Sequence, residues 1–200
     1  YMKAGISGLL YSGKTTIFNA LKAKSSQEEE TQSAKKKSQE LFTAKVKDPH
    51  LNELDSLFPG RKIVYPELVF VDIPTRQKDN VEKPDFLLLR DQDVIIEVVR
   101  FFEREDVLHT EGSIDPKRDI AFFEEILINE DLTAVNERIT RVETELKKGR
   151  KENQKEFDVL TKCRATLENK KPLRTLGLSL DEEKLIRGFK YLSLKPIVRV

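Results

Sequence analysis

The eight residues from Gly8 to Thr15 constrain the fold more than any other part of the chain. They read GLLYSGKT and fit G-x-x-x-x-G-K-[ST], the pattern of a phosphate-binding loop. In such a loop, backbone N–H groups converge on phosphate oxygens, the lysine reaches the terminal phosphates and the threonine hydroxyl ligates magnesium. The pattern indicates this chemistry only where a buried strand precedes it and a helix follows it.

The flanking residues supply that context. Residues 3–7 are a short segment that ends at a glycine, as a buried strand does before a turn, and Ile17, Ala20 and Leu21 follow at helical spacing. We therefore predict a nucleotide site at the loop; the alternative is a turn that only resembles one. The residues expected to hold the nucleotide are Gly8, Tyr11, Ser12, Gly13, Lys14, Thr15 and Thr16.

A second acidic position fits the metal side of such a site. Residues 68–71 read as an apolar strand, and Asp72 follows at its carboxyl end. That is where the second magnesium-side carboxylate is expected downstream of a phosphate loop. We therefore assign Mg²⁺ to Thr15 and Asp72, with a helix cap or turn acid as the alternative for Asp72.

The switch segments of a GTPase are hard to find in this chain. Asp72 begins the sequence DIPT, so the D-x-x-G pattern lacks its glycine and Thr75 stands in that place. Residues 22–39 lack apolar periodicity and predict a mobile loop or frayed helix, with a basic contact for RNA as the alternative. Thr31 is the nearest candidate for a first-switch threonine. Arg76 and Gln77 are candidates for the residue that positions the attacking water, but only their location in the sequence favours them. No catalytic residue is therefore assigned.

Residues 120–171 predict a helical insertion. Apolar residues at spacings of three and four run from Ile120 to Leu146 and again from Phe157 to Leu167, with a polar break at Gly149. Two such stripes predict an antiparallel coiled-coil hairpin. Cys163 lies on the second stripe and is interpreted as a small core residue.

Basic residues gather at the expected tip of this hairpin, where the two helices meet. They are Lys147, Lys148, Arg150, Lys151 and Lys155. They are either solvated helix ends or a contact for ribosomal RNA, in which phosphate contacts would dominate affinity.

Outside the insertion, Arg100 closes a strand at 94–99 and is expected in a surface salt bridge, or otherwise near the nucleotide. Further strands are predicted at 41–46, 63–65 and 197–200, and a last helix carries Ile186 and Phe189.

The composition excludes several classes of protein. Lys and Arg total 36 against 35 Asp and Glu, so no overall basic field favours nucleic acid. One cysteine and two histidines give neither an internal disulfide nor a metal cluster, and they fit a reducing cytoplasm. The sequence contains no run of eighteen apolar residues, so it predicts no membrane span.

Several segments together resemble the Obg-like ATPase family, the YchF subfamily of translation-factor-type P-loop NTPases. They are MKAGISGLLYSGKTTIFNAL, KVKDPHLNELDSLF, KIVYPELVFVDI, DVIIEVVRFFEREDVLHTEGSIDPKRDI and KPIVRV. The resemblance implies a Ras-like α/β P-loop NTPase fold, a mostly parallel sheet flanked by helices, interrupted by an antiparallel helical hairpin. It also implies a cytoplasmic protein that binds ATP or GTP with Mg²⁺, hydrolyses it slowly and associates with ribosomes.

The resemblance divides the chain into a nucleotide-binding domain, residues 1–118 and 172–200, and an insertion, residues 119–171. Departures from the family lie at Tyr11 and Ser12, at Thr75 and at Arg76. The base-reading motif and a ubiquitin-like domain are expected beyond Val200, so the preference for ATP or GTP stays open. The oligomeric state is open as well. Two alternatives stand beside the slow NTPase. One is a nucleotide-binding interaction module that has lost hydrolysis; the other is a coiled-coil adaptor with a vestigial loop.

Overall fold

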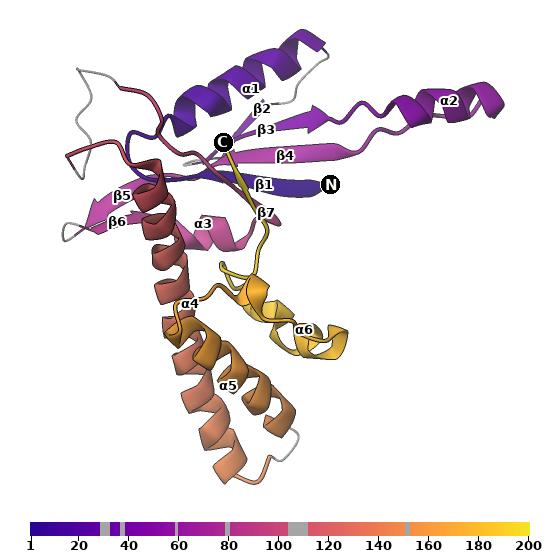
Figure 1. Ribbon diagram of the computed structural model, residues 1–200. Coiled ribbons are helices and arrows are strands. Elements are labelled where there is room, and N and C mark those ends of the chain that lie inside the picture. The colour runs from indigo at the N-terminus through magenta and orange to yellow at the C-terminus, as the bar shows by residue number, and fades with distance from the viewer. Residues whose placement is uncertain (29–32, 37–38, 59, 79–80, 104–111, 151–152) are drawn as a thin grey trace.

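A six-stranded sheet forms the centre of the computed structural model (Figure 1), which describes the 200 residues except 29–32, 37–38, 59, 79–80, 104–111 and 151–152. The strands lie in the order β2-β3-β4-β1-β7-β8. Their bounds are β1 Met2–Ser7, β2 Ser33–Lys36, β3 Gln39–Lys45, β4 Glu67–Asp72, β7 Val94–Glu97 and β8 Ile197–Arg199. Strands β4, β1, β7 and β8 are parallel, and β3 and β2 extend the sheet antiparallel to them. This confirms the predicted mostly parallel α/β fold.

Helices cover both faces of this sheet. Their bounds are α1 Lys14–Glu28, α2 Pro49–Leu57, α3 Phe86–Arg90, α4 Pro116–Lys147, α5 Gln154–Glu168 and α6 Leu180–Ile186, with short 3₁₀ turns η2 Leu173–Thr175 and η3 Arg187–Phe189. On one face Phe18 of α1 packs with Ile6 and Phe42. On the other face Leu89 of α3 and Phe123 of α4 share a core with sheet residues. A separate two-stranded antiparallel sheet is formed by β5 (Thr75–Lys78) and β6 (Val81–Pro84), the β5–β6 hairpin.

The predicted helical hairpin is present, and in Figure 1 it projects away from the sheet. Val135, Ile139 and Val142 of α4 are buried with Leu160 and Cys163 of α5 in one cluster. Cys163 is fully buried, and burial raises the pKa of its thiol to about 11, so its interpretation as a core residue is confirmed. The limits of the two proposed units stay a prediction; α4 itself begins at Pro116, capped by the Asp115 side chain.

A buried carboxylate joins this hairpin to the chain that returns to the sheet. Asp131 of α4 accepts hydrogen bonds from the backbone N–H groups of Leu192 (2.9 Å) and Ser193 (2.7 Å) and from the Ser193 hydroxyl (2.7 Å). Arg90 of α3 lies 3.9 Å away. Burial raises the pKa of Asp131, and these donors oppose the rise. The carboxylate therefore fixes the path of the segment that leads into β8.

A second buried carboxylate lies at the carboxyl end of β7. Glu97 accepts a hydrogen bond from Arg199 Nε of β8 at 3.0 Å. Glu124 of α4 and Arg174 of η2 belong to the same network, in which Glu124 bonds both Arg174 and Arg199, and Asp119 of α4 lines the same small cavity as Glu97. Burial raises the pKa of Glu97 to about 7, and Arg199 opposes that rise. The network connects four elements, β7, β8, α4 and η2, around the Glu97 carboxyl.

Three expectations about secondary structure were wrong. Residues 22–39 were expected to be a mobile loop or a frayed helix; α1 does continue to Glu28, but residues 33–36 form a strand that pairs with β3, because ladder hydrogen bonds outweigh the lack of an apolar pattern. Residues 63–65 form no strand, and Val64 is exposed. Phe189 lies in a 3₁₀ turn after α6 rather than within that helix. Among the residues that the structure describes, no helix combines the length and apolarity needed to cross a membrane.

We expect Asp131→Ala to lower the free energy of unfolding by about 3 kcal/mol, because it leaves two backbone donors buried without their acceptor. Chemical denaturation followed by circular dichroism measures this loss. Ser193→Ala removes only a hydroxyl and should cost about 1 kcal/mol. Equal effects of the two substitutions would contradict the role given to the carboxylate.

We expect the free energy of unfolding to fall as the pH rises from about 4.5 to above 7, by up to about 3 kcal/mol from Glu97 alone. The folded protein holds a proton on Glu97 that the unfolded chain releases near the ordinary pKa, so the native state is penalised once Glu97 must ionise. Urea denaturation at pH 5 and pH 8 measures the difference. Glu97→Gln should flatten the dependence, and an unchanged profile in this variant would rule the assignment out.

Candidate functional site

The phosphate loop, residues 8–15, connects β1 directly to α1 as the motif requires. Gly8 has φ +149° and Gly13 has φ +100°, both in the region that favours glycine. A Cβ on Gly8 would lie 2.5 Å from the Val98 carbonyl oxygen, so the chain after β7 leaves no room for a side chain there. Tyr11 adopts φ +59° although it is not glycine. The two glycines of the motif are therefore explained by backbone conformation and close packing.

Lys14 lies at the first position of α1 with its side chain folded back over the loop. Its ammonium donates to the Leu9 carbonyl at 2.5 Å. Burial lowers its pKa to about 8, while the negative charges of Asp72 and Glu82 oppose the fall. The amine therefore lies in a partly dehydrated position where a negative ligand would stabilise its charged form.

Thr15 and Asp72 come together from different elements. Asp72 ends β4, where it is opposite Ile6 in the parallel register with β1, and its carboxylate accepts a hydrogen bond from the Thr15 side chain. Burial raises the pKa of Asp72, with Glu40 adding to the rise and Lys14 opposing it. A hydroxyl and a carboxylate oxygen side by side fit the ligand preference of Mg²⁺. Across the described ranges, no group of three or more His, Cys, Asp or Glu could by itself hold a metal.

An open cavity of about 440 Å³ lies over the loop. Its lining consists of Leu10, Tyr11, Gly13, Lys14, Thr15, Thr16, Asp72, Ile73, Pro74, Thr75 and Phe102. Most of the residues predicted to hold the nucleotide and the metal therefore face one space. Gly8 is not part of this lining, and Ser12 is buried and lines a different cavity on the far side of the loop.

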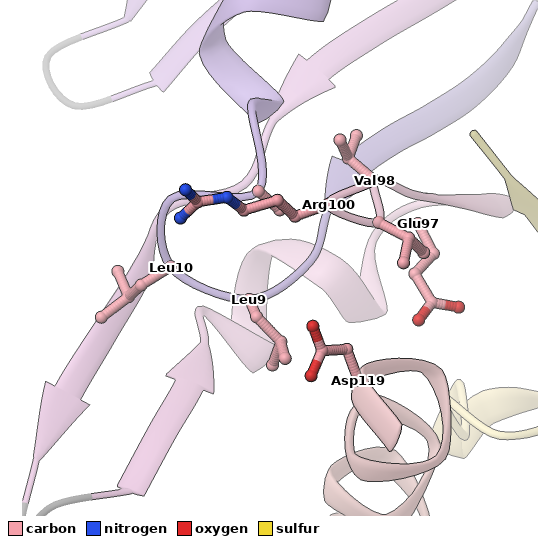
Figure 2. A pocket seen from close by; sticks show the side chains of 8 residues that line it. Leu9, Leu10, Glu97, Val98, Arg100 and Asp119 are labelled. Carbon is pink, nitrogen blue, oxygen red and sulfur yellow. The ribbon is translucent and has the colours of Figure 1, made fainter. Parts of the chain in front are cut away.

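Figure 2 shows side chains that line this second cavity, among them Leu9, Glu97 and Asp119; its volume of about 10 Å³ has room for about one water molecule. Arg100 crosses the loop in the same view. Arg100 is buried, donates from Nε to the Phe102 carbonyl at 3.1 Å and stacks 5.1 Å from the Phe102 ring centroid. The expected surface position of Arg100 was wrong, because its side chain packs against Phe102, which borders the cavity over the loop.

The β5–β6 hairpin contacts the loop at two points that the sequence did not predict. The Thr75 hydroxyl donates to the Gly8 carbonyl at 2.7 Å, and Glu82 accepts from the Leu10 N–H at 2.6 Å. Arg76 and Gln77 lie on β5, are exposed and do not line the cavity over the loop. Thr31, the candidate first-switch residue, lies outside the described residues. The sequence singled out Thr75 only because it replaces a glycine, and it gave no signal for Glu82, because a contact across some seventy residues leaves no local pattern.

Comparison with known proteins gives a consistent result, although no family model matches the chain. It is 32% identical over 203 residues to "Ribosome-binding ATPase YchF" of Escherichia coli O157:H7, covering 99% of this chain and 56% of that protein. It is 30% identical over 212 residues to the protein of that name from Bacillus subtilis, covering 100% of this chain and 56% of the relative. The chain thus spans about half the length of these curated relatives.

The fold itself is found in a solved structure. The Schizosaccharomyces pombe YchF GTPase superposes with a TM-score of 0.79 at 22% identity, over 99% of this chain and 55% of that one. At that identity the likeness concerns the fold alone. The sequence relatives and the shared architecture agree over the same stretch of chain. Over nearly its whole length the chain is therefore similar to about half the length of the proteins named YchF, which supports the resemblance to the Obg-like family.

Proposed function

We propose that this chain binds ATP or GTP together with Mg²⁺ at the phosphate loop and that it hydrolyses the nucleotide slowly. The observation that carries the proposal is the convergence of Lys14, Thr15 and Asp72 on one cavity over a loop between β1 and α1. Curated relatives named as ATPases support the same activity.

Each group has a distinct part in binding. Backbone N–H groups of residues 8–15 and the amino end of α1 would hold the phosphate oxygens. Lys14 would exchange its contact with the Leu9 carbonyl for the terminal phosphates, which restores the stability of its charge. The Thr15 hydroxyl and Asp72 would hold Mg²⁺, which neutralises the phosphate charge when bound.

Slow hydrolysis follows from what surrounds the loop. Efficient transfer needs a residue that positions the attacking water and groups that stabilise charge on the transferred phosphoryl. Arg76 and Gln77, the candidates by location, are exposed on β5 and do not border the cavity. The same observation, that neither candidate residue borders the cavity, also favours a second function, a nucleotide-binding module that does not hydrolyse its ligand. Measuring phosphate release separates the two.

A link to the ribosome is part of the proposal. The relatives are named as ribosome-binding, and the chain carries an exposed basic tip, here residues Lys147, Lys148, Arg150 and Lys155 of the helical hairpin. Lys151, also predicted there, lies outside the described residues. The tip is at the end of the hairpin that projects from the sheet (Figure 1), so RNA phosphates can approach it without contacting the nucleotide site. A cytoplasmic location fits this role.

We expect Lys14→Ala to weaken nucleotide binding by about 100-fold, because it removes a charged hydrogen-bond donor from the phosphates. Titration of the chain with fluorescent ATP and GTP analogues in the presence of Mg²⁺ measures the dissociation constants. Lys190→Ala is a suitable control, since Lys190 is exposed and pairs with Asp91. Equal affinity of wild type and Lys14→Ala would exclude the phosphate loop as the binding site.

We expect reversal of charge at Lys147, Lys148 and Arg150 to weaken ribosome binding and to reduce its salt dependence, because fewer phosphates are neutralised. Co-sedimentation with purified ribosomes over a range of salt concentrations gives both quantities. A matched reversal at Lys171, Lys184 and Arg187 changes the net charge equally at exposed positions away from the tip. If both triple variants lose binding alike, net charge rather than the tip is responsible.

A further inference from the structure

Glu82 of β6 is a buried acid in contact with the phosphate loop. It is only 4% exposed, and its Oε2 accepts the Leu10 N–H at 2.6 Å. Its other oxygen, Oε1, is buried and has no hydrogen-bond partner among the residues that the structure describes. A carboxylate in such a position loses much of its hydration, so a strong local attraction must hold it there.

The groups that attract Glu82 are the ones that a phosphate would use. Leu10 is the third residue of the loop, and backbone N–H groups of such loops point at phosphate oxygens. Lys14, which reaches the terminal phosphates in this motif, is also attracted to the Glu82 charge. Leu10 and Lys14 both line the nucleotide cavity. The carboxylate therefore uses donors that belong to the anion site.

The element that carries Glu82 can separate from the main sheet without breaking it. Within the described part of the chain, β5 and β6 pair with each other and with no other strand, from Thr75 opposite Pro84 to Lys78 opposite Val81. Among the described residues, two hydrogen bonds join the hairpin to the loop, from the Leu10 N–H to Glu82 and from the Thr75 hydroxyl to the Gly8 carbonyl. Few bonds would have to break for the hairpin to withdraw from the loop.

We propose that Glu82 determines which nucleotide the phosphate loop accepts: its carboxylate competes with the third phosphate of a nucleoside triphosphate for Leu10 and Lys14. A diphosphate binds with the β5–β6 hairpin docked, and a triphosphate binds only when the hairpin withdraws. The inference rests on the proposed nucleotide binding. It makes the hairpin the element that distinguishes the two nucleotide states, in a chain where Thr75 occupies the position of the usual sensing glycine.

Calorimetric titration with Mg²⁺ and either a nucleoside diphosphate or its non-hydrolysable triphosphate analogue tests the proposal. We expect Glu82→Gln to lower the dissociation constant of the triphosphate about tenfold and that of the diphosphate less than about twofold, because the amide removes the charge and keeps the size. Glu67→Gln is the matched control, because Glu67 is an exposed acid at the opposite end of β4 from Asp72. The ratio of its triphosphate and diphosphate dissociation constants should match that of the wild type.

A second measurement uses the unmodified chain and does not depend on the folding of a variant. Hydrogen exchange of residues 81–84 should speed up when the triphosphate analogue binds and not when the diphosphate binds. Two results would overturn this inference and leave the proposed function standing, provided that both nucleotides bind tightly. One is a ratio of triphosphate to diphosphate dissociation constants that Glu82→Gln does not change. The other is hydrogen exchange at residues 81–84 that is the same with either nucleotide. Absence of binding by wild type and Glu82→Gln alike would overturn the proposed function itself.

Discussion

The close approach of the chain after β7 to the start of the phosphate loop is the constraint on which the site depends. The Val98 N–H donates to the Ser7 carbonyl at 2.8 Å, and its carbonyl oxygen fills the space where a Cβ on Gly8 would lie. Parallel pairing of β1 with β4 then sets Asp72 beside the loop, and α1 begins with Lys14. The residues proposed to bind metal and phosphate are thus placed by backbone register.

The sequence predicted those features that depend on local pattern. The loop motif, the acid after an apolar strand and the two helical stripes each lie within a short stretch, where residue type and spacing decide the structure. The strand Ser33–Lys36 could not be found this way, because its polar residues are held by pairing with β3 and not by an apolar face. Asp131 is similar, since its partners Leu192 and Ser193 are some sixty residues away.

The part of the site that the sequence missed is its electrostatic surroundings. Glu82 gave no signal in the sequence, and Thr75 and Arg100 were noted there for other reasons. Only the fold shows that Glu82 and Thr75 hydrogen-bond to the loop and that Arg100 contacts Phe102. Burial gives the charged residues these roles, because a charge that water no longer solvates interacts strongly with its neighbours. Sequence spacing carries no information on which charges will lose their water.

The length of α4 has a mechanical consequence. Its 32 residues make a rod of about 48 Å. Asp119, in its first turn, borders the cavity beneath the phosphate loop, while the other end leads to the basic tip. A tilt of about 10° at the base would displace the far end by about 8 Å over this length. The helix therefore has the geometry of a lever, in which a small rotation beside the sheet becomes a displacement of several ångströms at the far end of the hairpin.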